Sequence, residues 1–552
     1  MTISDIDLLE TNNINNNLYL KTAEDLLMWG TKPALNNKDV LMSSIGKLPS
    51  AKELVESPLA EELFSDGLVT YAKNTSYFDK YLPEFGSLAQ GLIPRLVQMP
   101  YFRKTLANLV FPVAFPIPAA SDAPTKTVRR TIRNPKLTLD NKCPRCLESY
   151  WYSPVRRSGK YWISTGVYAK QGQLVKLTIP EGLVGKFDIQ LGCHTDDIMQ
   201  KNLNKWSRGK PVLRPGRVTQ TYPREILNKE TYLLSPYGGL IYIMIEHDNS
   251  LGDFDLTFEN AMESPLYIHG ISNNEEWQAS LKASKAPMVE IEVPGLVLSI
   301  TRNAVDKMKP DMEVLANLYK SVMQSLFDLQ GYKNVVAQRY LYDIDITSGI
   351  AHAGYPAPTT IEDSGLVDQK MTSLACFGHE MGHNIQDSRW TASKMTEVTN
   401  TLFMNYIQEK HFGKKDWRGD YRSAEDFRNK GRSFSNLRRS EKRMCFRMVL
   451  GECGWDGYKK FFKYYQDHIP AKLNPNTDEN KHSTIVRVLS LTCNRNLVPF
   501  FQWWKWPVLE DTIEATKDLP EWKGIIHKLN TFESKYSMIG LSLSKNLPIC
   551  SF

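Results

Sequence analysis

Five consecutive residues of this chain, His379 to His383, have the types and the spacing that catalytic zinc sites use. They read H-E-x-G-H. On a helix, positions i and i+4 lie on one face, so the imidazoles of His379 and His383 can converge on one metal ion. Glu380 lies next to His379 and can reach a water molecule held at an open position of that metal. The pentapeptide therefore predicts two zinc ligands and a general base, and it leaves a third ligand to be found.

The chemistry that this set predicts is hydrolysis. A zinc ion with three protein ligands lowers the pKa of its bound water to about 7, and a neighbouring carboxylate can take up the proton. The alternative is that His379 and His383 are ordinary helix residues. Leu374 and Phe377 give the preceding turn an apolar side, which suits a helix buried beside a cleft. We therefore favour zinc binding.

A third ligand is expected from the next helical segment. Glu397 follows His383 by fourteen positions. Apolar residues recur at helical spacing from 398 to 406, which predicts a second helix with Glu397 in its first turn. The polar stretch Asn384 to Lys394 would turn the chain back so that this helix crosses the first. His, His and Glu form a known catalytic zinc set. The alternative is that Glu397 is a helix N-terminal acid favoured by the helix dipole.

The combination of these residues resembles the enhancin-like metallopeptidases, peptidase family M-sixty. The family pattern is H-E-x-G-H, a variable gap and a ligand Glu. The residues that match it position by position are His379, Glu380, Gly382, His383 and Glu397. Further stretches that agree are Ser235-Pro-Tyr-Gly-Gly-Leu-Ile-Tyr242, His352-Ala-Gly-Tyr-Pro356, Asn496-Leu-Val-Pro-Phe-Phe501 and Trp506-Pro507. The resemblance covers about residues 150 to 530.

This resemblance implies a zinc endopeptidase, which in several relatives cuts mucins or other O-glycosylated proteins. The vertebrate TRP-channel-associated factors are also similar to the family and are better known as regulators of membrane channels. The resemblance therefore leaves two functions open. One is hydrolysis of a protein or glycoprotein substrate with Zn²⁺ as cofactor. The other is a catalytically silent, zincin-like interaction module that regulates a membrane protein or another partner.

Composition narrows the class of protein. The chain has 552 residues, of which 42% are hydrophobic and 23% charged, and its formal net charge is +7. These values are typical of a globular protein with about three or four domains. The basic runs Lys126–Arg133 and Arg428–Arg443 are interpreted as solvated faces. The sequence contains no nucleic-acid-binding module, so we expect no nucleic-acid partner.

The periodicity of the sequence predicts an α+β multidomain fold with four regions. Residues 1–125 carry helix-like apolar spacing, and residues 126–144 are basic and contain proline, as in a linker. From 145 to 285, short β-branched and aromatic runs alternate with Gly, Pro and Asn, which predicts an antiparallel β-sandwich accessory domain. Its aromatic residues are interpreted as core, with a glycan-binding platform as the alternative. The resemblance implies a zincin-like (gluzincin) peptidase domain over 286–552, with a mostly helical C-terminal subdomain.

The region before the zinc helix is the candidate for binding substrate. It begins with a strand at Leu296–Ile300 and a helix whose apolar stripe covers residues 315–329. In zincins an edge strand beside the cleft pairs with the substrate backbone, and the segment around His352 is the natural candidate for it. His352 or Tyr355 could face the substrate and polarise the scissile carbonyl. The alternative is a loop histidine beside a Tyr-Pro turn.

The sequence shows no targeting segment. Its N-terminus carries acidic residues where a secretory signal carries basic ones, and the run Leu106–Ala120 is broken by three prolines. That run is too short and too interrupted for a transmembrane helix. We therefore expect neither a signal peptide nor a membrane span, and a cytoplasmic location by default. Secretion by a non-classical route is the alternative.

Eight cysteines are scattered along the chain without a regular spacing. Such scatter predicts free thiols in a reducing compartment. Cys143 and Cys146 form a lone C-x-x-C without a second pair at zinc-ribbon spacing. We interpret them as a structural or surface pair rather than as a second metal or redox site.

Overall fold

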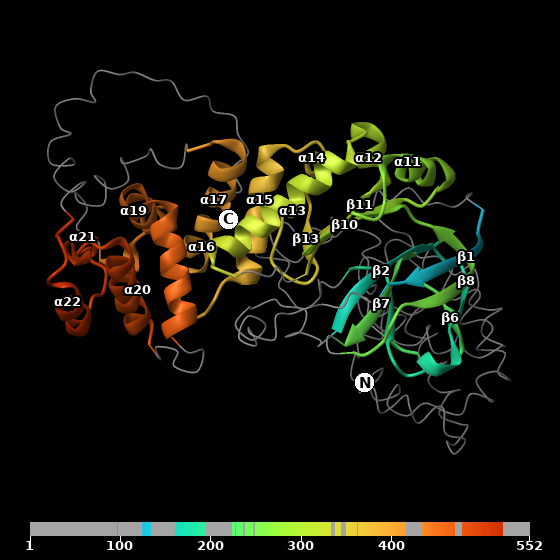
Figure 1. Cartoon of the computed structure of the whole chain (residues 1–552), viewed down its shortest axis with the longest axis horizontal. Helices are drawn as coiled ribbons and strands as arrows, with labels where there is room; N and C mark the ends of the chain where they lie inside the picture. The colour runs from blue at the N-terminus through green and yellow to red at the C-terminus, as the bar shows by residue number, and fades with distance from the viewer. Residues whose placement is uncertain are drawn as a thin grey trace, which may run out of the picture.

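The computed structural model describes most of the second half of the chain and parts of the first. The described residues are 97, 124–133, 160–194, 224–226, 228–235, 238–246, 249–332, 337–343, 349–361, 363–415, 433–469 and 477–522. Figure 1 shows that they run from a strand-rich region at one end of the molecule to a group of helices at the other. The helices expected before residue 125 and the Cys143–Cys146 pair lie outside this part of the chain.

The strand-rich region is one antiparallel sheet around a shared core. Its strands follow the order β5-β4-β7-β2-β8-β3-β6, and β1 pairs with β8. They are β1 (Lys126–Ile132), β2 (Lys160–Ala169), β3 (Val175–Thr178), β4 (Asp188–Leu191), β5 (Arg224–Glu225), β6 (Glu230–Leu233), β7 (Gly239–Glu246) and β8 (Phe254–Glu263). Ile189 on β4, Ile243 on β7 and Leu177 on β3 belong to one buried cluster. The sheet-rich architecture expected here is confirmed.

The structure corrects two of the expected boundaries. Lys126–Ile132, expected in a linker, is strand β1 and pairs with β8. Its buried Val128 and Ile132 alternate with more exposed basic residues, as in an amphipathic strand. At the other end, β9 (Leu266–Ile268) pairs in parallel with a strand of the second sheet. The boundary expected at residue 285 therefore lies too late in the chain.

A second sheet of five strands carries the candidate site. Its order is β13-β12-β11-β10-β9. Its other strands are β10 (Met288–Val293), β11 (Leu296–Thr301), β12 (Gln338–Tyr342) and β13 (Ala357–Thr359). Strands β11, β12 and β13 run parallel to one another, whereas β10 is antiparallel to β11. Strand β11 confirms the strand predicted at Leu296–Ile300.

Helices pack against this sheet and form the C-terminal part of the described chain. α13 (Met312–Leu329) begins at Asp311, whose side chain accepts hydrogen bonds from the N–H groups of Glu313 and Val314, a favourable N-cap. Its apolar stripe is buried in the same core as the sheet, as the spacing over 315–329 predicts. The other helices are α11 (Asn274–Ala283), α12 (Arg302–Met308), α14 (Ser364–Val367), α15 (Met371–Ile385), α16 (Thr396–Thr399), α17 (Thr401–Phe412), α19 (Arg439–His468), α20 (Asp478–Cys493), α21 (Val498–Trp503) and α22 (Glu510–Thr516).

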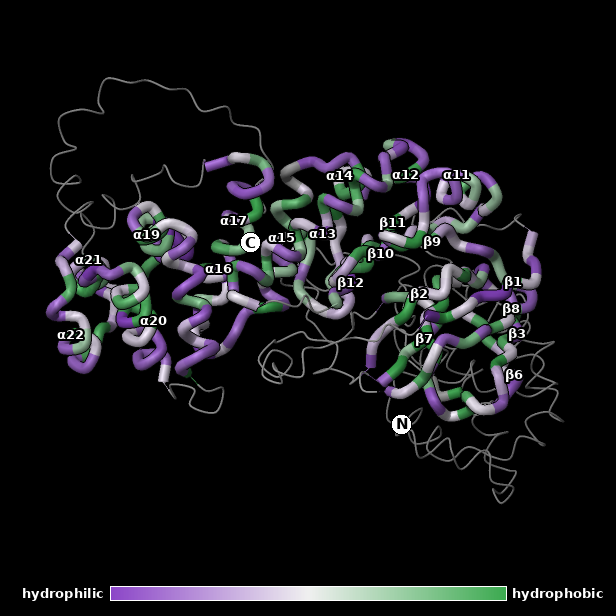
Figure 2. Tube along the Cα trace, in the orientation of Figure 1, coloured by the Kyte–Doolittle hydropathy of each residue, from purple (hydrophilic) through white to green (hydrophobic). Residues whose placement is uncertain are grey.

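Figure 2 shows hydrophobic and hydrophilic residues alternating along these helices, as expected where one face of each is buried. None of the described helices is both long and apolar enough to cross a membrane.

The structure also corrects the expectation that the cysteines are free thiols. Cys453 and Cys493 form a disulfide that joins α19 to α20, with Cα atoms 5.3 Å apart. Cys376 is disulfide-bonded as well. Among the described cysteines, Cys193 and Cys445 are free. The spacing of the cysteines does not reveal the first pair, because only the packing of two helices brings these distant residues together.

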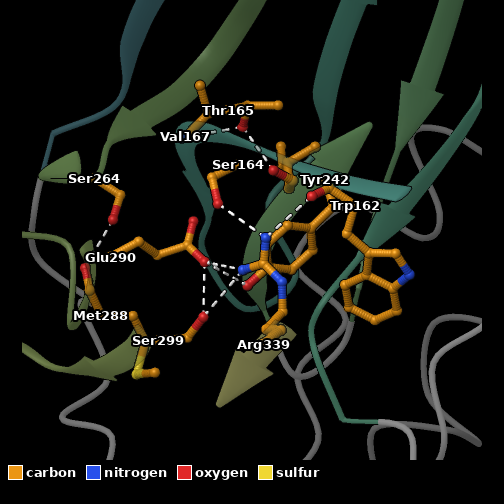
Figure 3. Close-up of polar contacts among 11 residues, drawn as sticks. Trp162, Ser164, Thr165, Val167, Tyr242, Ser264, Met288, Glu290, Ser299 and Arg339 are labelled. Carbon is orange, nitrogen blue, oxygen red and sulfur yellow. Dashed lines mark hydrogen bonds and ion pairs between the residues drawn. The ribbon is translucent and has the colours of Figure 1, made fainter. Parts of the chain in front are cut away.

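A buried ion pair within the second sheet also contacts the first sheet. Arg339 on β12 and Glu290 on β10 are 0% and 1% exposed, and their Nη1 and Oε1 atoms lie 2.5 Å apart. Arg339 also donates to the carbonyl of Trp162 at 3.3 Å and to the hydroxyl of Ser164 at 3.1 Å, both on β2 of the first sheet. Its guanidinium lies over the ring of Tyr242 on β7, 4.7 Å from the centroid (Figure 3). One buried cation therefore connects strands of both sheets.

The substitution Arg339→Met tests this connection, because it leaves Glu290 buried without its cation. Removing one partner of a buried ion pair costs about 3–5 kcal/mol. We expect the free energy of unfolding to fall by that amount in urea unfolding followed by tryptophan fluorescence. The control is Arg487→Met, whose pair with Asp511 is far more exposed and worth about 0–1 kcal/mol. Equal losses in the two variants would show that the buried pair does not hold the sheets together.

Candidate metal centre

Helix α15 presents the two histidines of the pentapeptide on one face. Its residues Phe377 and Met381 are fully buried in the core that α15 shares with α13. His379 and His383 lie one turn apart, are also buried, and have ring centroids 4.7 Å apart. The structure thus brings the two imidazoles together in the way that their spacing predicts.

Glu397 on α16 completes a triad with the two histidines. Its Oε2 atom is 3.2 Å from His379 Nε2, its Oε1 atom is 3.4 Å from His383 Nε2, and the two Nε2 atoms are 3.1 Å apart. Ligand atoms placed tetrahedrally at zinc distances of about 2.0–2.1 Å would lie about 3.3 Å apart. Among the described residues this is the one cluster of three His, Cys, Asp or Glu side chains that could hold a metal ion. The triad therefore has the spacing of a tetrahedral zinc site.

The charges of the triad suit a metal cation. Burial lowers the pKa of His379 to about 4, which keeps this imidazole neutral and able to bind metal at neutral pH. Burial acts to raise the pKa of Glu397, but hydrogen bonds from the two histidines outweigh it and hold the pKa well below its ordinary value. Burial acts to lower the pKa of His383, but the hydrogen bond and charge of Glu397 raise it. Two imidazole nitrogens and a carboxylate are a donor set that catalytic zinc sites use.

Glu380 lies beside the triad with a free carboxylate oxygen. It is 1% exposed, and its Oε1 atom is buried without a hydrogen-bond partner. Burial raises its pKa to about 7, although the charges of His383 and His352 act in the opposite direction. A carboxyl group with a pKa near neutrality can both accept and return a proton. The arrangement therefore leaves Glu380 available for proton transfer.

Gly382 allows a close contact at the level of the triad. A Cβ atom at this position would lie 2.2 Å from Asn400 Oδ1 and 2.9 Å from Phe403 Cβ. One turn earlier, a Cβ atom on Gly378 would lie 2.5 Å from Ile407 Cδ1. Asn400 Nδ2 uses this proximity to donate to a main-chain carbonyl of α15 at 2.9 Å. The glycine of the motif therefore has a packing role, because it lets the α16–α17 segment approach the ligand helix.

Gln386 orients the two segments that carry the ligands. Its Oε1 atom accepts a hydrogen bond from His383 Nδ1 at 2.8 Å. This contact fixes the proton on Nδ1 and leaves Nε2 for a metal. Its Nε2 atom donates to the carbonyl of Thr396 at 2.7 Å and to the hydroxyl of Thr399 at 2.8 Å. Since these threonines flank Glu397, one amide positions both a histidine ligand and the helix of the carboxylate ligand.

The residues before β13 form the outermost described segment of the second sheet. Ala351 pairs antiparallel with Thr359, and its neighbours Ile350 and His352 hydrogen-bond to the backbone of Thr360 and of β13. Because these bonds come from the residues on either side, the N–H and C=O of Ala351 point away from β13. This is where the sequence predicts an edge strand for the substrate.

Asn384, directly after the motif, ties the edge segment to α15. Its Nδ2 atom donates to the carbonyl of Gly354 at 2.8 Å, and its Oδ1 atom accepts from the N–H of Gly354 at 2.9 Å. His352 lies two residues earlier, is half-buried, and its charge acts on Glu380. The structure therefore brings His352 to the candidate centre, and its contact with a substrate stays a prediction.

The structure corrects the expectation that Tyr355 faces the substrate. Tyr355 is 7% exposed, and its ring meets Trp162 edge-on with centroids 5.9 Å apart. It belongs to an apolar cluster between the two sheets that also contains Leu341 and Met288. Its side chain is used in this junction and offers a substrate almost no surface.

The prediction of a solvated face is wrong for Arg443. This residue lies on α19, half-buried rather than on a solvated face, and its Nε atom donates to the main-chain carbonyl of Glu397 at 2.9 Å. Its charge also acts on His379. The signal that was available is the apolar sequence Met444-Cys445-Phe446 directly after it, which marks a buried face on the same helix.

Known protein families match all of the second sheet and all of the first except strand β1. The family described as Peptidase M60, enhancin and enhancin-like matches residues 260–505. The N-terminal domain of M60-like peptidases matches residues 153–259. The two matches meet within β8, just before the strand β9 that joins the second sheet. The family division therefore agrees with the corrected boundary.

Curated relatives include channel-associated proteins. The chain is 28% identical over 378 residues to the TRPM8 channel-associated factor homolog of Danio rerio, which covers 65% of this chain and 40% of that protein. It is 28% identical over 386 residues to TRPM8 channel-associated factor 1 of Homo sapiens, covering 67% of this chain and 40% of that protein. The chain thus spans about two fifths of the length of these relatives.

Solved structures with a similar fold include metallopeptidases. The catalytic module of the metalloprotease ZmpA from Clostridium perfringens has a TM-score of 0.53 at 15% identity, covering 72% of this chain and 80% of that chain. IMPa from Pseudomonas aeruginosa, in complex with an O-glycopeptide, has a TM-score of 0.54 at 14% identity, covering 83% of this chain and 63% of that chain. At these identities the likeness concerns the fold.

The substitution Gly382→Ala tests the close approach of the helices. Its methyl group would overlap Asn400 and Phe403, and overpacking of this kind typically costs about 1–3 kcal/mol. We expect urea unfolding to show that loss. The control is Gly451→Ala on α19, where a Cβ atom meets nothing within 4 Å and alanine should stabilise the helix by about 0.5–1 kcal/mol. A Gly382→Ala protein as stable as Gly451→Ala would rule out the tight contact.

The substitution Gln386→Met tests the positioning of His383. It removes the acceptor for His383 Nδ1 and both hydrogen bonds to the Glu397 helix, and loss of such a partner typically weakens metal binding by about 10- to 100-fold. Zinc affinity is measured by competition with a chelator. The control is Gln324→Met on α13, whose amide bonds to Asp328. If both variants bind zinc as tightly as the wild type, Gln386 does not position the metal ligands.

Proposed function

The chain belongs to the peptidase M60, enhancin and enhancin-like family, and from that premise we propose that it is a zinc-dependent endopeptidase. The observation that carries this proposal is the triad of His379, His383 and Glu397 with donor atoms 3.1–3.4 Å apart. Its second support is Glu380, which offers an unpartnered buried oxygen next to the triad.

In the proposed mechanism the triad holds Zn²⁺, which when bound would supply an acidified water and an electrophilic contact for the scissile carbonyl. Glu380 takes the proton of the attacking water and later delivers it to the leaving amine. A pKa of about 7 suits both steps, since the carboxyl group must be deprotonated in the first and protonated before the second.

The edge segment is proposed to position the substrate. Ala351 is itself buried, so we assign the contact with a substrate to the half-buried His352 beside it. His352, the next residue, lies close enough to Glu380 for its charge to act there, so we assign it the hydrogen bond to the carbonyl oxygen of the scissile bond. Asn384 keeps this segment in register with α15 through its two bonds to Gly354.

The substrate proposed for this peptidase is a protein or glycoprotein, with mucin-like O-glycosylated proteins as the favoured class. One of the similar structures, IMPa, is described in complex with an O-glycopeptide. We extend that substrate class to this chain on the strength of the shared fold and the intact triad.

A second candidate function is an interaction module that regulates a membrane channel or another partner. It is favoured by the curated relatives, which are named as TRPM8 channel-associated factors. The geometry of the site favours the peptidase, because a docking scaffold has no physical need for three metal-ligand side chains and an unpartnered carboxylate beside them.

The substitution Glu380→Gln separates these functions. It removes the general base and leaves the three ligands in place, so we expect about one zinc per chain and a fall in turnover of about 100- to 10,000-fold. Zinc is measured by elemental analysis, and turnover on casein and on an O-glycosylated mucin. The control is His383→Ala, which should lose the metal as well.

Turnover by Glu380→Gln at the wild-type rate would contradict the proposed mechanism. A wild-type protein that takes up no zinc, even after reconstitution, would favour the interaction module.

A further inference from the structure

Three arginines on α19 follow one another toward the candidate metal centre. Arg439, Arg443 and Arg447 are spaced four residues apart, so their side chains lie on one face, about 6 Å apart along the helix axis. Arg439 is exposed, whereas Arg443 and Arg447 are partly buried. Each of the two inner guanidinium groups is repelled by the arginine one turn before it. We call Arg443 and Arg447 the inner arginine pair.

The inner arginine pair adjoins the metal-ligand segment. Arg443 Nε donates to the main-chain carbonyl of Glu397 at 2.9 Å, and the charge of Arg443 acts on His379. This contact uses one of the five N–H donors of the guanidinium group. Arg447 lies one helical turn further along the same face of α19. Arg443 therefore contacts the segment that carries a metal ligand, and Arg447 extends the positive charge by one helical turn.

The inner arginine pair has no carboxylate of its own in the described part of the chain. The carboxylate that acts on Arg443 is that of Glu397, which already lies 3.2 and 3.4 Å from two histidine nitrogens. Arg447 Nε is buried without a hydrogen-bond acceptor, and burial together with Arg443 lowers the pKa of Arg447 to about 10. Burial of an unpaired cation is costly, and like charges four residues apart on a helix repel. An anion between the two guanidinium groups would offset both costs.

The two fully buried arginines among the described residues each have a carboxylate partner. Arg339 is paired with Glu290 at 2.5 Å. Arg389 is paired with Asp387 at 2.5 Å, and its Nη1 atom donates to the carbonyl of Tyr465 at 2.7 Å. The inner arginine pair departs from this pattern next to the residues that would bind the metal. The inner arginine pair therefore lacks a counter-anion among the described residues, which leaves its guanidinium groups able to bind an anionic ligand.

We propose that the inner arginine pair is an anion subsite that binds a carboxylate or sulfate group of the substrate next to the scissile peptide bond. This inference rests on the proposed peptidase function and specifies its substrate. Guanidinium groups bind such oxyanions through parallel N–H donors, and both arginines retain free donors. The group can come from an Asp or Glu side chain of the substrate polypeptide or from an acidic sugar attached to it.

Binding is tested first, without cleavage. The zinc-loaded full chain carrying Glu380→Gln is titrated by calorimetry with acetyl-Ala-Asp-Ala-amide, with its Asn counterpart, and with free N-acetylneuraminic acid. We expect one carboxylate probe to bind and the neutral Asn peptide to bind at least about tenfold more weakly, as for a charged hydrogen bond lost from a buried site. Adding Arg447→Gln should weaken the binding of the carboxylate probe by about 10- to 100-fold. Adding Arg495→Gln, whose exposed side chain pairs with Glu452, should change nothing.

Carboxylate binding that is the same with and without Arg447→Gln would overturn the proposal, and so would a complete lack of carboxylate binding. Whichever of the two carboxylate probes binds identifies the source of the acid, the polypeptide or its glycan.

Cleavage is tested second, on a library of glycopeptides with and without sialidase treatment, with sites located by mass spectrometry. The wild type should cleave next to an acidic group at one fixed position, and Arg447→Gln should lose this preference while still cutting neutral peptides. Cleavage by the wild type with no acidic preference would overturn the subsite. If the zinc-loaded wild type cleaves nothing, the proposed peptidase function fails, and the calorimetry alone decides whether the anion subsite exists.

Discussion

The candidate centre depends on the close approach of the α16–α17 segment to the backbone of α15. Glu397 can meet the histidines of α15 at 3.2 and 3.4 Å only because the segment that carries it packs against a strip of α15 that has no side chains. Gly382 provides this strip at the level of the triad. Asn400 then donates a hydrogen bond to the main-chain carbonyl of His379. Gln386 joins the end of α15 to the same segment. The ligand geometry is thus a consequence of main-chain packing.

Side-chain contacts also connect the first sheet to the candidate centre. Arg339 connects Glu290 of the second sheet to Trp162 of the first, and Trp162 packs against Tyr355. Tyr355 is adjacent to Gly354, which Asn384 holds against α15. The sheet-rich region therefore supports the segment that lies beside Glu380, rather than standing apart as an accessory domain. Its aromatic side chains that reach this junction are buried, as the sequence predicts for core residues.

Local patterns were sufficient to predict the parts of this structure that depend on neighbours in sequence. The i, i+4 spacing of His379 and His383 fixes their common face, and the β-branched and aromatic runs at β2 and β7 mark those strands. Such patterns could not predict contacts between segments that are distant in the sequence. A basic run can be an amphipathic strand, as at β1, or can carry a half-buried residue such as Arg443, because charge alone does not show what packs above it. Gln386 and the Cys453–Cys493 disulfide likewise depend on helix packing that no short motif records.

Charge compensation separates the structural from the functional parts of this chain. Where an ionised group is buried for structure, the chain supplies its partner, as at Arg339 with Glu290 and at Arg389 with Asp387. Around the triad this rule is left incomplete in both signs, because neither Glu380 nor Arg447 has an ion-pair partner among the described residues, and each has a buried atom without a hydrogen bond. A buried polar atom without a partner costs about 1–3 kcal/mol, and more when it is charged. Since nothing in the fold recovers that cost, the two groups are explained together if a substrate and its attacking water complete the site.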